Sequence, residues 1–176
     1  MSRRPLLYLL AVAVIVVFFG GCSSDGCLSN QNALPMAAFY SASADKQVSV
    51  RGLQISGVGA PGDSVLVPAT QSVTTVYLPM RSDRSSTQWQ LLYRPSEALT
   101  ITDYITFDYT SEPHFVSEEC GAMYFYRITH VDYTTNMIDS VVVTDSLITN
   151  YDLTRIRIYL HEEDESEEEA PEEPEQ

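Results

Sequence analysis

The chain of 176 residues has few basic side chains, 10 Lys and Arg against 24 Asp and Glu. Nucleic-acid binding needs a basic face, so nucleic acid is excluded as the main partner. With 8 Gly and 9 Pro, the chain is not a collagen-like or low-complexity protein. The sequence has no Gly-x-Ser-x-Gly, His-Glu-x-x-His or Gly-x-x-x-x-Gly-Lys motif, and no zinc-type spacing among its 3 Cys and 3 His. We therefore expect no metal and no cofactor.

What the sequence does contain is an uncharged apolar run near its start. Two arginines precede residues 6–19, and Gly-Gly-Cys22 follows this run directly. The run is short for a membrane-spanning helix of about 20 residues but fits the core of a signal peptide. Residues 19–22, Phe-Gly-Gly-Cys, resemble a bacterial lipobox, in which small residues precede the cysteine that is lipidated after cleavage.

The lipobox-like segment sets the expected domain organisation. We expect a lipoprotein signal peptide over residues 1–21, a tether over 22–32 that begins at lipidated Cys22, and a β domain over 33–161. Each buried methylene contributes about 0.8 kcal/mol, so two or three acyl chains hold a protein firmly in a membrane. The alternative is an uncleaved N-terminal anchor helix.

Two further cysteines, Cys27 and Cys120, remain once Cys22 is set aside. An even number in an exported chain favours a disulfide. The bridge would close a loop of about ninety residues and stabilise the fold by roughly 4–5 kcal/mol. The alternative is two separate thiols.

An acidic tail closes the sequence. Ten of the fifteen residues 162–176 are Asp or Glu, and such a run repels itself and buries nothing, so we expect a disordered, solubilising tail. Residues 22–161 hold eight basic and 14 acidic side chains, a formal charge of −6, which is ordinary for a domain. The acidity therefore belongs to the tail and does not indicate a binding site.

Residues 33–161 show the period-two pattern of β-strands. Apolar side chains occupy the odd positions from Leu99 to Tyr109, with Asp103 as the exception. Several short strands separated by turns predict an all-β fold, a single antiparallel β-sandwich or barrel-like domain. The other expected strands cover residues 123–133, 154–160, 73–80 and 88–93, with weaker signals at 36–40, 47–55, 64–67 and 140–143.

Two local irregularities carry expectations of their own. Asp103 interrupts an apolar face, so it marks a bulge, a bend or a polar contact. Residues 134–137, Thr-Thr-Asn-Met, are typical of a hairpin turn, in which Asn136 is able to adopt a positive φ.

Several segments taken together resemble one protein family. They are the lipobox with Cys27 five residues on, and residues 119–126, 131–136, 138–140 and 156–159. The chain resembles, over residues 22–160, the uncharacterised lipoproteins of Bacteroidota classed as DUF6452. The resemblance implies lipoprotein topology and pairing of Cys27 with Cys120, and it assigns no catalytic residue.

The resemblance also bears on location. Surface-exposed lipoproteins of such bacteria often carry an acidic cluster just after the lipidated cysteine, whereas residues 23–26 hold a single acid. This favours a lipid-anchored protein of the outer membrane that faces the periplasm, with exposure at the cell surface as the alternative.

Carboxylate pairs are the first catalytic candidates. Glycoside hydrolysis needs two carboxylates about 5–9 Å apart, and Asp103, Asp108, Glu118 and Glu119 are available. The two adjacent glutamates point to opposite faces of an extended strand, so a solvated loop before Cys120 is favoured over a catalytic pair.

His130 is the second candidate. By parity it shares a strand face with Tyr126 and Ile128, and Asp132 follows two residues later. A His–Asp pair can orient an imidazole, but no Ser or Cys nucleophile accompanies it. We therefore favour a surface histidine beside a carboxylate, and we expect no enzyme.

Aromatic side chains offer one candidate ligand platform, formed by Trp89, Tyr104, Tyr124 and Tyr126. The same residue types also fill the cores of small β domains. Two functions therefore stand: a non-enzymatic module that binds or assembles another envelope protein, which we prefer, and a glycan-binding module or glycoside-processing accessory protein. An exposed apolar patch or strand edge favours the first, and a concave site with several exposed aromatics favours the second.

Overall fold

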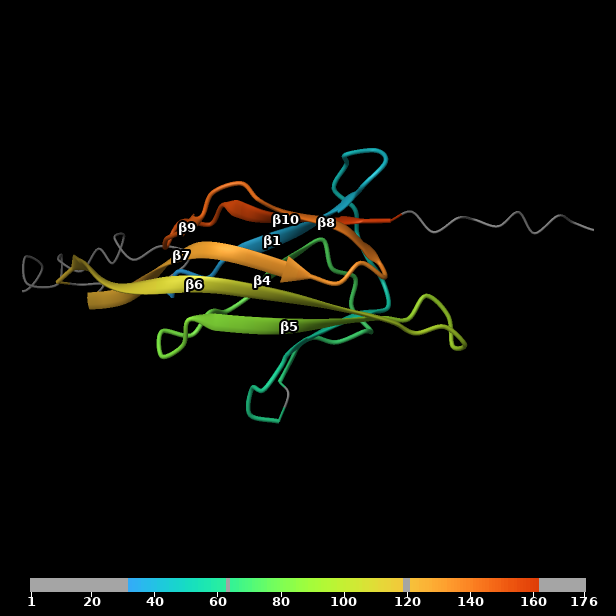
Figure 1. Ribbon diagram of the computed structural model, residues 1–176, viewed down its shortest axis with the longest axis horizontal. Coiled ribbons are helices and arrows are strands. Elements are labelled where there is room, and N and C mark those ends of the chain that lie inside the picture. The colour runs from blue at the N-terminus through green and yellow to red at the C-terminus, as the bar shows by residue number, and fades with distance from the viewer. Residues whose placement is uncertain (1–31, 63, 119–120, 162–176) are drawn as a thin grey trace, which may run out of the picture.

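The computed structural model describes residues 32–62, 64–118 and 121–161, which form two stacked β-sheets (Figure 1). The first sheet has four strands in the order β4-β1-β10-β8. Strands β1 and β10 pair in parallel, and the other two pairings of this sheet are antiparallel. The bounds are Met36–Ser41 for β1, Thr75–Tyr77 for β4, Ile138–Val143 for β8 and Thr154–Leu160 for β10.

The second sheet has six strands in the order β3-β2-β5-β6-β7-β9, and all its pairings are antiparallel. Its centre is the long hairpin of β6 and β7, which Figure 1 shows running beyond the end of β5. The bounds are Leu53–Gly57 for β2, Val65–Val67 for β3, Ser86–Tyr93 for β5, Ile101–Ser117 for β6, Gly121–Tyr133 for β7 and Leu147–Ile148 for β9.

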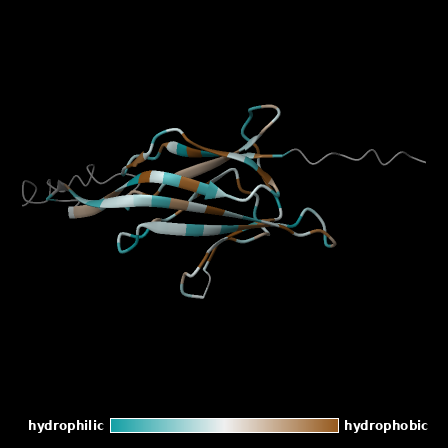
Figure 2. Cartoon of the chain, in the orientation of Figure 1, coloured by the Kyte–Doolittle hydropathy of each residue, from teal (hydrophilic) through white to brown (hydrophobic). Residues whose placement is uncertain are grey.

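The core lies between the two sheets because each contributes one apolar face. Figure 2 shows this alternation as brown and teal bands along the strands. Burying both faces supplies the main driving force of folding, about 25 cal/mol for each Å² of apolar surface removed from water. The largest fully buried side chains are Phe39, Ile138, Ile156 and Ile158 of the first sheet, and Leu53, Ile55, Leu91, Ile105, Phe107, Tyr109 and Ile148 of the second.

The predicted all-β sandwich is confirmed, and over the described residues the sheets do not close into a barrel. Several strand bounds differ from the predicted ones. The strand predicted at 99–109 continues to Ser117, and that at 47–55 divides into isolated bridges at Gln47 and Val50 followed by β2. Residues 1–31 and 162–176, with the predicted signal peptide, tether and tail, lie outside the described residues. The described part of the chain holds no helix long and apolar enough to span a membrane.

A β-bulge corrects the predicted face of His130. Across the hairpin, Asp108 pairs with His130 but Tyr109 pairs with Ile128, so Thr129 is an extra residue on β7. One extra residue reverses the parity of everything beyond it. Tyr126 and Ile128 therefore point into the core, whereas His130 is exposed on the outer face.

Residues 134–137 are a crossing between the two sheets, not the predicted hairpin turn. They join β7 of the second sheet to β8 of the first, and Asn136 is not among the residues with positive φ. The predicted polar contact of Asp103 explains the crossing. Its carboxylate accepts hydrogen bonds from the backbone N–H groups of Asn136 (2.9 Å), Met137 (2.6 Å) and Ile138 (3.0 Å), and from the Thr134 hydroxyl.

Candidate functional site

The two ends of the sandwich are built differently, and one of them is closed by tyrosines. The Tyr109 hydroxyl accepts a hydrogen bond from Arg81 N–H (3.0 Å) and lies 2.7 Å from the Thr87 hydroxyl. Tyr126 packs edge-on against Tyr109, with ring centroids 5.5 Å apart, and its hydroxyl donates to the Met80 carbonyl. These contacts fasten the segment after β4 to the second sheet.

Beyond this closed end, β6 and β7 continue as a two-stranded ribbon. We call residues 110–117 and 121–125 the arm. Within it the two strands pair only with each other, because the β5–β6 ladder ends at Asp108 and β9 reaches only Tyr126 and Arg127. Both outer edges of the arm therefore present backbone groups without a strand partner among the described residues, the usual template for an added strand.

The arm also exposes apolar side chains. Phe115 is 64% exposed and Tyr124 is 43% exposed, and the register places Pro113 opposite Tyr124 on the same face. On the other face, the rings of His114 and Phe125 stack with centroids 4.3 Å apart. The arm thus combines open strand edges with exposed rings.

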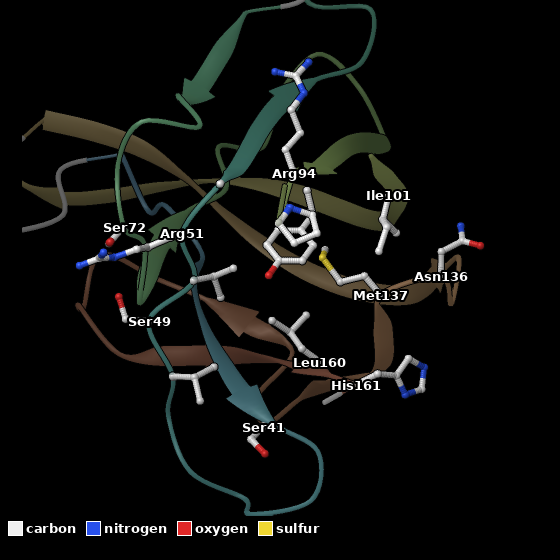
Figure 3. Close-up of a pocket in the computed structure, with 15 residues that line it drawn as sticks. Ser41, Ser49, Arg51, Ser72, Arg94, Ile101, Asn136, Met137, Leu160 and His161 are labelled. Atoms are coloured by element: carbon white, nitrogen blue, oxygen red, sulfur yellow. The ribbon is translucent and has the colours of Figure 1, made fainter. Parts of the chain in front are cut away.

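The opposite end of the sandwich opens into a cleft of about 990 Å³ between the two sheets (Figure 3). Figure 3 shows Met137, Leu160 and Ile101 on its floor. Strand β6 begins beside this cleft and ends in the arm. At about 3.3 Å per residue, roughly 30 Å of strand separates Ile101 at the cleft from Thr110 at the base of the arm.

The rim of the cleft is polar and carries positive charge. Arg51 and Arg94 are exposed, and neither forms an ion pair with any described residue. Gly52 sets their position: it has a φ of 74°, and Arg94 N–H donates to its carbonyl at 3.0 Å. A Cβ at Gly52 would lie 2.4 Å from the Arg94 carbonyl oxygen, so only glycine fits this approach.

Two carboxylates lie near the cleft, and both are engaged. Asp139 is 3.7 Å from His161 on the rim. Asp103 lies beneath the floor, bonded to Asn136 and Met137. Burial raises the pKa of Asp103, but the hydrogen bonds from Thr134 and from three backbone N–H groups outweigh it, so this pKa lies below its ordinary value. Among the residues that the structure describes, no carboxylate side chain lines the cleft itself.

The four aromatic residues predicted as a platform do not share one surface. Trp89 and Tyr126 are each only 6% exposed and belong to the core. Tyr104 lies on the outer face of the second sheet, where its hydroxyl accepts a hydrogen bond from Gln90. Tyr124 lies on the arm and is the one exposed ring of the four.

The candidate carboxylates are also dispersed. Asp103 faces inward and is fully buried, Asp108 faces outward on the same strand, and Glu118 lies at the end of the arm. His130 and Asp132 do meet, with Nε2 and Oδ1 3.2 Å apart, but both side chains are more than half exposed. Over the described ranges no three His, Cys, Asp or Glu side chains gather as metal ligands would. Glu119, Cys22, Cys27 and Cys120 lie outside those ranges.

The sequence predicted neither the arm nor the rim of the cleft. The arm was missed because Pro113 and the polar residues around it break the alternation that ended the predicted strand at Tyr109. The rim was missed because Arg51 and Arg94 lie 43 positions apart, and only strand pairing brings Gly52 opposite Arg94. One signal for the rim was present in the sequence: Arg51 directly precedes Gly52, and Arg94 directly precedes Pro95.

The fold is that of a two-sheet β-sandwich with one open end and one projecting hairpin. The model of a family described as a family of unknown function, DUF6452, matches residues 52–160, which include β2 to β10. The chain belongs to this family. No curated protein and no solved structure matches it.

Proposed function

We propose that this protein is a lipid-anchored lipoprotein of the cell envelope that binds or assembles another envelope protein and performs no catalysis itself. The arm is the observation that carries the proposal. Its open edges can accept an extended segment of a partner, and its exposed Phe115 and Tyr124 supply apolar contact beside those edges.

The place where the described chain begins supports the anchor. Pro35 lies next to Leu78, whose N–H donates to its carbonyl, and Met80 bonds to Tyr126 at the base of the arm. The described chain therefore begins at the end of the sandwich that carries the arm. With lipid on Cys22, the arm lies near the outer membrane, on its periplasmic side, and meets partners held in the same membrane.

The cleft and the platform residues give less support to a glycan-binding role. Sugar sites use several exposed aromatic rings that converge on one concavity. Of the described Phe, Tyr and Trp side chains only Tyr93 lines the cleft, and Trp89 and Tyr126 are buried. A protein partner is therefore preferred.

The experiment places a photo-crosslinking amino acid at Phe115 of the full chain in living cells. The matched control places it at Leu99, which is also exposed but lies at the cleft end of β6. We expect one defined adduct from position 115, identified by mass spectrometry as an envelope protein, and none from 99. The adduct should fall several-fold with Tyr124→Ser, because an exposed ring next to the contact is lost.

Two outcomes would contradict the proposal. Equal adducts at positions 115 and 99 would show that the contacts are nonspecific and that the arm is not a binding site. Absence of an adduct, together with saturable binding of the purified protein to polysaccharide, would favour the glycan-binding alternative.

The anchor is tested separately: Cys22→Ser should release the protein from membranes into the soluble fraction, and retention in the membrane would refute lipidation at this residue.

A further inference from the structure

The cleft at the end of the sandwich opposite the arm has a cationic rim. Its rim carries Arg51 and Arg94, which are exposed and form no ion pair among the described residues, and no carboxylate lines it. Two other arginines do pair with an aspartate: Arg81 with Asp83, and Arg155 with Asp145. The chain itself holds 24 acidic residues that can supply a partner for this rim.

The acidic tail starts at this rim. His161 lines the cleft, and its N–H donates to the Met137 carbonyl at 3.0 Å, which holds the last described residue in place. The ten carboxylates of residues 162–176 follow directly. An extended chain advances up to about 3.5 Å per residue, so about four to six residues beyond His161 reach across a cleft of this size.

We propose that residues 162–176 dock into the cleft, with their glutamates paired to Arg51 and Arg94. Attachment at His161 makes the contact intramolecular, so the local concentration of the tail is in the millimolar range and weak ion pairs are sufficient. Since the rim is exposed, the pairing depends on ionic strength.

Arginine modification by phenylglyoxal, read residue by residue by mass spectrometry, tests this directly. The full chain is compared with a variant in which the ten acidic residues of the tail are Gln, which keeps its length. In dilute buffer we expect Arg51 and Arg94 to react at least about threefold more slowly in the full chain. Arg84 is the internal control, because it is exposed, forms no ion pair with a described residue and does not line the cleft.

Salt and a peptide complete the test. Raising NaCl to about 0.5 M should abolish the protection, because such salt screens exposed charges. A synthetic peptide of residues 162–176 should restore it when added to a chain that ends at His161. Equal reaction rates of Arg51 and Arg94 in the full chain and the Gln variant would overturn the proposal, as would equal protection of Arg84, which would indicate a nonspecific effect of the tail.

Discussion

Asp103 shows how one residue can join the two sheets. Its carboxylate is fully buried on β6 of the second sheet, yet its hydrogen-bond donors belong to the segment that leads into β8 of the first. A buried carboxylate is stable only when such donors compensate for lost water. The residue that breaks the apolar pattern of its strand is therefore the one that positions the crossing between the sheets.

We predict that Asp103→Asn lowers the free energy of unfolding by about 3 kcal/mol at pH 7, since an amide cannot accept all the bonds that this carboxylate accepts and leaves buried N–H groups unpaired. Urea unfolding followed by Trp89 fluorescence measures the change. Asp108→Asn is the matched control. It lies outward on the same strand, so its effect should stay within about 0.5 kcal/mol, and equal effects would contradict the role given to Asp103.

The pH dependence of the same pair of proteins follows from the lowered pKa of Asp103. In the unfolded chain this carboxyl titrates near its ordinary value of about 3.9. The stabilisation is therefore complete above that pH and is lost as the pH falls towards the lower pKa of the folded state. The gap between wild type and Asp103→Asn should be constant near neutrality and shrink in acid. A gap that stays unchanged down to pH 2 would contradict this.

At the scale of elements, sequence periodicity predicted strands better than it predicted their partners. Strand β10 has the predicted bounds because Ile156, Ile158 and Leu160 alternate without interruption. The two-residue β9 has too little pattern to be detected, and only its pairing with β7 defines it. Parity also failed for His130, because one extra residue, Thr129, reverses the faces of β7.

The arm depends on the tyrosines at its base, and we predict that Tyr109→Phe lowers the free energy of unfolding by about 1–3 kcal/mol. The loss of the hydroxyl leaves the part-buried Arg81 N–H without its acceptor and removes the contact with Thr87. Chemical denaturation measures the change, and hydrogen exchange should be faster at Arg81.

Tyr104→Phe is the control for this prediction. Its hydroxyl is bonded to Gln90 on the outer face of the sheet, where water replaces a lost partner, so the cost should be below about 1 kcal/mol. Similar decreases in the free energy of unfolding for the two variants would show that the hydrogen bonds of the Tyr109 hydroxyl stabilise the fold no more than an exposed one does.

At the scale of the whole molecule, the candidate surfaces follow from topology more than from any motif. The cleft gathers residues from the ends of β1, β5 and β10 and from the start of β6, and these are distant in sequence. No spacing rule joins Arg51 to Arg94, because loop paths and strand order decide their distance. The aromatic residues singled out by composition were instead divided between core and surface by the alternation of their strands.

The described chain begins at the end of the sandwich that carries the arm, and this bears on the expected pairing of Cys27 with Cys120. Asn32 follows Cys27 by five residues, a reach of up to about 17 Å. The arm extends a similar length, about 17 Å, from Tyr126 to Gly121, next to which Cys120 lies in the sequence. The two lengths are equal, so the five residues between Cys27 and Asn32 are long enough to allow this pairing.

We predict that the mature protein carries this bridge and that its mass is two hydrogens below that of the dithiol form. Closing a loop of roughly ninety residues restricts the unfolded chain, so Cys27→Ser should lower the free energy of unfolding by roughly 4 kcal/mol and leave Cys120 open to alkylation. Cys120→Ser should have the same effect, and the double variant should be no less stable than either single one, because all three remove one bond. Alkylation of both cysteines in the untreated wild type would contradict the prediction, and additive losses in the double variant would show that the two side chains act separately.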